Sequence, residues 1–129
     1  MIERQEYRVD ALAEPISHYT DAVRAGDLLF VSGFVPVDGD GRVVGGDDVV
    51  AQTRQVFANI GRVLAAAGTT FEQVVKVTVY LTDVDDRTKI NPVRQEIFGE
   101  TRPASTLFEV SRLAIPGAKI EIDLVTIVP

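Results

Sequence analysis

The chain has 129 residues, 46% of them hydrophobic, and a net charge of −6, which predicts one domain spanning residues 1–129. The absence of cysteine excludes disulfides and thiolate sites, and the single histidine makes a metal cluster implausible, so we expect no cofactor. No basic run favours nucleic-acid binding, and no segment is predicted to be a signal peptide or membrane helix, so we expect a cytoplasmic protein that does not bind membranes.

Alternating and turn-rich segments fill the first third of the chain. Short strands are expected at residues 7–9, 20–24 and 28–32. The last two flank Ala25-Gly26-Asp27, which is typical of a hairpin turn. A further extended segment, 35–44, is interrupted by a loop tip at 38–41.

A long amphipathic helix is predicted next. Asp47 and Asp48 have the character of an N-cap and a first-turn acid. Gly68, after three alanines, is a plausible C-cap. Apolar and small residues recur at helical spacing between them, and we expect Gln52, Gln55, Asn59 and Arg62 to lie mostly off this face. The face consists of Val49, Thr53, Val56, Phe57, Ile60, Leu64 and Ala67.

The second half of the chain predicts a strand, a helix and two more strands. In residues 73–81 an apolar set of side chains alternates with a more mixed set, and this pattern predicts a strand. A helix over about 84–98 contains Pro92, which predicts either a kink or a restart with Asn91 as the N-cap and Pro92 at the first position. The final strands are expected at 105–110 and 119–128.

The resulting element order, β-β-β-α-β-α-β-β, predicts an α+β fold with both helices on one face of a six-stranded mixed sheet. The last strand is apolar on both sides: Ile120, Ile122 and Leu124 point one way, and Val125 and Ile127 the other. One layer of helices cannot cover both faces of a sheet. The pattern therefore favours association between the sheets of different subunits.

Several segments in order resemble one protein family. They are Ser17-His18-Tyr19, the run from Leu29 to Gly33 followed by Val35-Pro36-Val37, Gln52-Thr53-Arg54-Gln55 with Asn59-Ile60, Pro103-Ala104 with Glu109-Val110, and Lys119-Ile120-Glu121-Ile122. Together they resemble the RidA/YjgF/L-PSP family of reactive-intermediate deaminases over about residues 15–128. The resemblance implies a chorismate-mutase-like fold and a homotrimer with a cleft at each subunit interface.

The resemblance also implies a small-molecule substrate and a set of site residues. In the family's deaminases, the cleft holds an imine or enamine derived from an amino acid, and the products are a 2-keto acid and ammonia. The residue matching Glu121 positions the attacking water and handles protons. The substrate-binding positions match Tyr19, Ser32, Asn91, Ser105 and Leu107.

Ser105 departs from the family pattern, because the deaminases carry an arginine there that pairs with the substrate carboxylate. A serine offers one neutral hydroxyl where an arginine offers a charged fork. The cleft then binds a less anionic ligand, uses another cation, or has lost catalysis. Arg102 is the nearest cation in sequence, but three residues away on a strand it would face the opposite side.

For the other candidate residues, a structural role competes with a functional one. Glu121 and Asp123 share a strand face about 7 Å apart, which suits paired acid and base roles but also two solvated acids. We favour a cleft position for Glu121 and a structural role for Asp123. His18 is either a general acid or base or a surface residue. Phe34 either narrows the pocket or fills the core.

Three functions remain open on the sequence. The first is a trimeric hydrolase or deaminase acting on a C–N metabolite, with specificity altered by Ser105. The second is a non-catalytic metabolite binder or chaperone-like protein on the same scaffold. The third, an endoribonuclease, is disfavoured by the acidic charge and the absence of a basic stripe. A polar cleft that holds Glu121 favours the first, and a cleft plugged by Phe34 favours the second.

Overall fold

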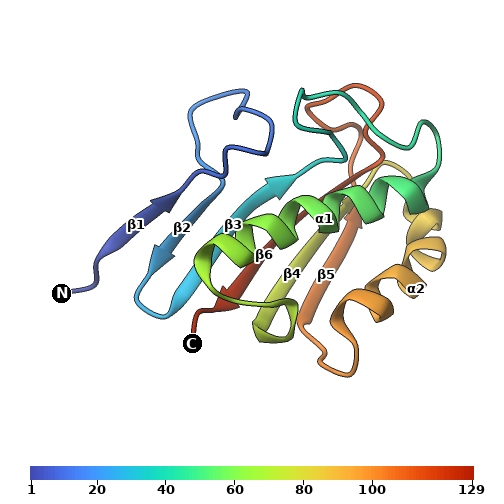
Figure 1. Ribbon diagram of the computed structural model, residues 1–129. Coiled ribbons are helices and arrows are strands. Elements are labelled where there is room, and N and C mark those ends of the chain that lie inside the picture. Colours follow the sequence, from blue (N-terminus) through green and yellow to red (C-terminus); the bar gives the residue numbers. More distant parts are fainter.

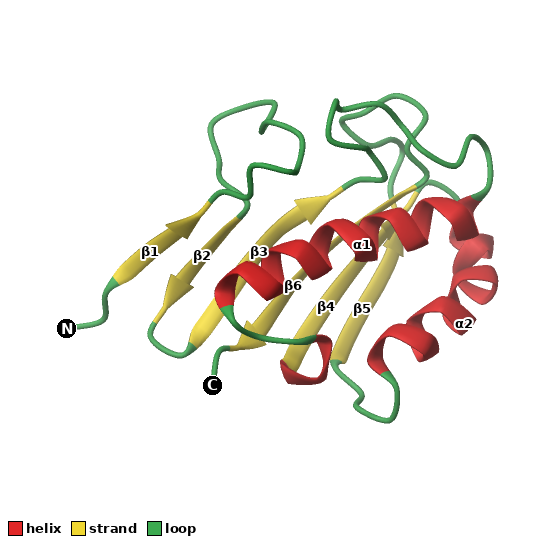
Figure 2. Ribbon diagram, in the orientation of Figure 1, coloured by secondary structure: helices red, strands yellow, loops and turns green.

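A computed structural model describes all residues, 1–129, as one mixed sheet with both helices on one face (Figures 1 and 2). The strands are β1 (Arg4–Tyr7), β2 (Ala22–Ala25), β3 (Leu28–Phe34), β4 (Val74–Leu81), β5 (Ala104–Glu109) and β6 (Ile120–Ile127). The helices are α1 (Val49–Ala67) and α2 (Arg87–Phe98), with 3-10 turns η1 (Phe71–Gln73) and η2 (Val84–Asp86). The predicted α+β class and element order are confirmed.

The sheet has the strand order β1-β2-β3-β6-β4-β5. Every neighbouring pair is antiparallel except β4 and β5, whose parallel pairing needs the α2 crossover between them. The C-terminal strand β6 therefore lies in the centre, between β3 and β4. Strand boundaries differ from the predicted ones by at most three residues. The segment 35–44 forms only the isolated bridge between Val37 and Val43 instead of a paired strand.

Capping residues fix both ends of α1. Gly68 is the C-cap as predicted, and Asp48 is the N-cap, but the predicted acidic residue in the first turn is absent because Asp47 precedes the cap. The Asp48 carboxylate accepts hydrogen bonds from the backbone N–H groups of Val50 and Ala51. Gly68 adopts a left-handed conformation with φ of 79°, which closes the C-terminus. The apolar face of α1 then packs on the sheet. The core under the helices includes three mutually edge-on rings, Phe57, Phe71 and Phe98, with centroids 5.7–5.8 Å apart.

Two polar residues of α1 are buried, contrary to the prediction that they lie off the packed face. Gln52 is fully buried, and its amide donates to the carbonyls of Gly46 and Gly117 while its oxygen accepts from Lys119 N–H. Asn59 donates to the carbonyl of Val37 at 3.0 Å. These bonds tie irregular loops to the helix, a task that an apolar residue cannot perform. Hydrophobic periodicity therefore does not identify these two polar positions as buried.

Helix α2 runs through Pro92 without interruption from Arg87 to Phe98. The predicted restart at Asn91 is therefore wrong. Pro92 lies at the sixth helical position and is exposed, so the N–H that it lacks would have bonded to the Thr88 carbonyl on an accessible face of the helix. Packing of Ile90 and Val93, both buried, holds the two halves of the helix together.

The other face of the sheet carries no helix, and we refer to it as the open face (Figure 1). Its side chains include Leu28, Phe30, Tyr80, Phe108 and Ile127. Phe30 and Phe108 are 48% and 43% exposed, and Tyr80 packs edge-on against Phe108. The prediction that the last strand is apolar on both sides is confirmed. Separately, neither helix has the length and hydrophobicity required to cross a membrane.

Candidate functional site

Glu121 lines a cavity of about 320 Å³ beside the end of β3. Tyr19 and Ser32 line the same cavity, so the structure brings together three of the predicted site residues. Phe34 does not line it. Phe34 instead packs against the core and borders an adjoining, smaller cavity of about 80 Å³, which Tyr19 and Gly33 also line. The cavity at Glu121 has a mixed lining of polar and apolar residues, and Phe34 does not plug it.

Gly33 allows the Glu121 side chain to lie across β3. A Cβ atom added at Gly33 would lie 2.9 Å from Cδ of Glu121 and closer still to Oε2. Any other residue would displace the carboxylate. Gly33 was not among the predicted site residues, although the Ser32-Gly33 pair that carried the resemblance contains it.

The environment of Glu121 favours its protonated form. Burial raises the pKa of this carboxyl above its ordinary value, and the negative charge of Asp123 raises it further. A carboxyl with a raised pKa takes up a proton more readily near neutral pH than an exposed one does. That property suits a group that must accept and return a proton.

Asp123 has a different partner. The Tyr80 hydroxyl donates a hydrogen bond of 2.7 Å to its carboxylate, and this bond, with burial, raises the pKa of Tyr80 to about 12. This hydrogen bond engages the Asp123 carboxylate on the open face, two residues from Glu121 in the sequence. The position agrees with the structural role expected for Asp123.

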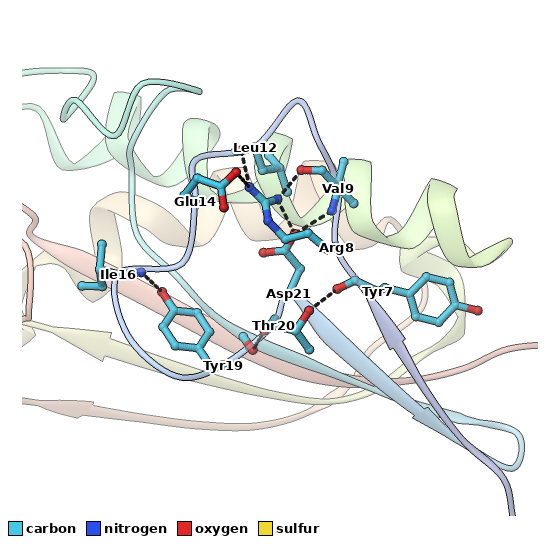
Figure 3. Close-up of polar contacts among 10 residues, drawn as sticks. Tyr7, Arg8, Val9, Leu12, Glu14, Ile16, Tyr19, Thr20 and Asp21 are labelled. Carbon is cyan, nitrogen blue, oxygen red and sulfur yellow. Dashed lines mark hydrogen bonds and ion pairs between the residues drawn. The ribbon is translucent and has the colours of Figure 1, made fainter.

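The loop that carries Tyr19 is held by a buried ion pair (Figure 3). Arg8 contacts the Asp21 carboxylate at 2.9 Å and also donates to the carbonyl of Leu12. The same carboxylate accepts from the Val9 N–H at 2.8 Å. Asp21 is only 3% exposed, so its charge requires these partners. The ion pair joins the two ends of the loop and thereby constrains the position of Tyr19.

Within this loop the predicted residues have few contacts. The Tyr19 hydroxyl accepts a weak hydrogen bond from Ile16 N–H at 3.5 Å, and the ring is 47% exposed (Figure 3). Ser32, on β3, donates from its hydroxyl to the Thr20 carbonyl at 2.6 Å. His18 is exposed and has no hydrogen bond or ion pair, as expected for a surface residue.

A second group of predicted residues gathers around α2 and β5. Asn91, Arg102 and Ser105 line a cavity of about 690 Å³, and Leu107 borders an adjoining one with Asn91. Arg102 lies in the loop before β5, not on the strand. The expectation that it faces away from Ser105 is therefore wrong, because the strand alternation on which it depended begins only at Ala104.

The two groups lie on opposite faces of the sheet. Ser105 pairs with Val77, whose side chain is buried under the helices, whereas Glu121 pairs with Tyr80 on the open face. Residues 77 and 80 differ by an odd number of positions, so their side chains point to opposite sides. One subunit alone therefore cannot place Glu121 and Ser105 around one small molecule.

Arg94 joins the second group, although the sequence pattern did not single it out. Its Nη2 atom donates a hydrogen bond of 2.7 Å to Oγ of Ser105. The signal that was available is its spacing, because Arg94 lies three residues after Asn91 and so on the same helix face. Which strand that face meets depends on the crossover of α2, and helical spacing does not reveal it.

Comparisons with known proteins agree with this architecture. A family model described as endoribonuclease L-PSP matches residues 10–128. A RutC family protein of Pyrococcus horikoshii is 48% identical over 101 residues, covering 78% of this chain and 79% of that protein. The crystal structure of the Rid family protein YyfA from Yersinia pestis is similar with a TM-score of 0.91 and 33% identity, over 98% of this chain and 100% of that one.

A second similar structure contains a ligand. The crystal structure of E. coli TdcF with bound serine has a TM-score of 0.86 and 28% identity, covering 95% of this chain and 98% of that one. The fold, the matched residues and the sequence identities confirm the predicted resemblance. The chain belongs to the Rid family, also named after YjgF, RutC and L-PSP.

Proposed function

We propose that the protein is a hydrolase that acts on the C=N bond of a small imine, or on its enamine tautomer. The observation that carries the proposal is Glu121, a half-buried carboxyl of raised pKa that lies over Gly33 in a cavity with Tyr19 and Ser32. Family membership supports the substrate class. The bound serine in TdcF supports a ligand of amino-acid size.

The chemistry requires one group that moves protons. The Glu121 carboxylate takes a proton from water while the water oxygen bonds to the imine carbon, and the C=N double bond becomes a C–N single bond. Glu121 then returns the proton to nitrogen, which gives a carbinolamine. Glu121 next takes the hydroxyl proton of the carbinolamine and passes it to the nitrogen while the C–N bond breaks, so that ammonia leaves and a carbonyl compound remains. An enamine is first protonated at carbon to give the imine.

The complete site requires two subunits. The Glu121 group and the Ser105 group lie on opposite faces of one sheet, and each borders a cavity open to solvent. In a homotrimer joined through the open faces, the Glu121 side of one subunit meets the α2–β5 edge of its neighbour. The exposed apolar side chains of the open face support this assembly.

Ammonia release from imines generated in solution tests the proposal. Glu121→Gln keeps the size of the side chain but cannot accept a proton. We expect it to lower the rate about 100-fold or more, within the range for loss of a general base. Asp123→Asn should cost far less, since Tyr80 already occupies that carboxylate. The exposed Glu72→Gln serves as a neutral control for the loss of one charge.

Equal rates for Glu121→Gln and the unmodified protein would contradict the proposed mechanism. If no imine in a panel that varies side chain and charge releases ammonia faster than in buffer, the protein is not such a hydrolase. Measurable binding of the same compounds without turnover would then favour the non-catalytic metabolite binder.

A further inference from the structure

Helix α2 delivers a guanidinium to the position where the resemblance leads us to expect one. Arg94 projects from α2 to β5, and its Nη2 atom lies 2.7 Å from Oγ of Ser105. Its side chain borders both cavities at this edge of the molecule. The positive charge that position 105 lacks in sequence is therefore present beside it in space.

Arg94 has no acidic partner. Arg8 pairs with Asp21 and Arg54 with Glu96, but no carboxylate lies within ion-pair distance of Arg94. A guanidinium has five N–H donors, and Ser105 accepts one of them. The guanidinium makes no other hydrogen bond within the chain, and Arg94 lines a cavity of about 690 Å³ and its neighbour. The charge and the hydrogen-bonding capacity of Arg94 are thus available to a ligand.

We propose that Arg94 binds the carboxylate of the substrate and replaces the arginine that relatives carry at the position of Ser105. The inference rests on the proposed function, because it assigns the anion-binding part of the same site. The ligands that suit this assignment are small monocarboxylates, which include the 2-imino acids and 2-oxo acids that the family resemblance already implies. A guanidinium fork binds a carboxylate through two parallel hydrogen bonds.

Burial distinguishes Arg94 from Arg102, the other cation in the cavity. Arg102 is exposed, so water competes for its charge. Arg94 is half-buried, and its burial lowers the pKa of the guanidinium, which nevertheless stays protonated. A carboxylate that enters the cavity compensates this partly desolvated charge. The gain from binding is larger than at an exposed side chain.

Ser105 is suited to this arrangement because it orients the guanidinium without neutralising it. An acidic residue there would form an ion pair with Arg94 and exclude an anionic ligand. An arginine at 105 would place two guanidinium groups together and repel Arg94. An arginine at position 105 and one at position 94 are therefore alternative solutions to the same binding problem.

Calorimetric titration with 2-oxobutanoate, with butanone as the neutral counterpart, tests the inference. We expect Arg94→Gln to weaken 2-oxobutanoate binding at least about tenfold, the loss of one charge-assisted contact, and to leave butanone unaffected. Arg94→Lys should bind with intermediate affinity, because it keeps the charge but loses the fork. The exchange Arg94→Ser with Ser105→Arg should restore most of the affinity.

Two control variants distinguish a contact with Arg94 from a general effect of positive charge. Arg62→Gln removes the same charge from an exposed site on α1 and should not change binding. Weakening by Arg102→Gln but not by Arg94→Gln would overturn the inference, as would a parent protein that does not bind 2-oxobutanoate. If Arg94→Gln does not fold, the Arg94→Lys and exchange variants decide the question. Binding is measured without turnover, so the outcome is independent of the Glu121→Gln rate test.

Discussion

At the scale of single residues, the site depends on charges that the fold leaves incompletely compensated. Glu121 is half-buried beside Asp123, and Arg94 is half-buried beside a neutral hydroxyl. Asp21, in contrast, is fully buried and receives Arg8 and a backbone N–H as partners. A compensated charge serves structure, whereas an uncompensated one costs stability and remains free to act on a ligand.

The stability cost of Glu121 gives a pH-dependent prediction. Its folded-state pKa lies above the ordinary 4.5, so ionisation disfavours the fold, and stability is lost as the pH rises through the raised pKa. Glu121→Gln is neutral at every pH. We expect it to unfold at a higher temperature than the parent at pH 8 and at nearly the same temperature at pH 4.

Thermal unfolding at the two pH values measures this difference, with the exposed Glu72→Gln as the control for losing one negative charge. A stabilisation that is larger at pH 4 than at pH 8 would have the wrong sign. It would mean that the folded protein favours the ionised carboxylate, contrary to the effect of burial.

At the scale of elements, α1 does more than cover the sheet. Through Gln52 it binds two loops, one directly before the helix at Gly46 and one remote in sequence, before β6, at Gly117 and Lys119. The Lys119 contact lies at the entry to β6, two residues before Glu121. A polar residue of the helix thus determines where the strand of the proposed catalytic group begins.

Gln52→Leu tests this role at nearly constant volume. It leaves two carbonyls and one N–H without their side-chain partner in a partly buried place, which we expect to lower the free energy of unfolding by about 2 kcal/mol. Gln95→Leu, at an exposed position of α2 without a side-chain hydrogen bond, is the matched control and should change little. Denaturant unfolding measures both, and equal effects of the two substitutions would contradict the account.

At the scale of the whole molecule, the open face has no cover within one chain. Apolar side chains of Leu28, Phe30, Phe108 and Ile127 remain 38–48% exposed on it. Burying apolar surface gives roughly 25 cal/mol per Å², so these side chains favour association with other copies. We expect a homotrimer with three times the 14.0 kDa mass of the chain.

Phe30→Asp places a charge in the middle of this face and should dissociate the trimer into monomers, because burying an unpaired carboxylate is costly. Ala58→Asp introduces the same charge at an exposed position of α1 and should leave the trimer intact. Light scattering after size-exclusion chromatography measures the mass. A trimer that withstands Phe30→Asp would show that the open face is not the interface.

Local patterns in the sequence determined most of the elements. Asp48 and Gly68 mark the ends of α1 because capping involves backbone groups only a few residues away. The alternation in residues 74–81 and 120–127 identified two strands and the two-sided character of the second. Ser105 and Glu121 stood out through resemblance to a family. These signals are local or positional, so one sequence contains them.

Only the tertiary structure decided which distant side chains meet. It placed Arg94 beside Ser105, buried Gln52 among three loop groups, and put Ser105 and Glu121 on opposite faces of the sheet. Helical or strand spacing specifies a face, but the element that the face contacts depends on strand order and on the α2 crossover. Those are set by the packing of the whole core, since no single segment contains the contacts that stabilise them.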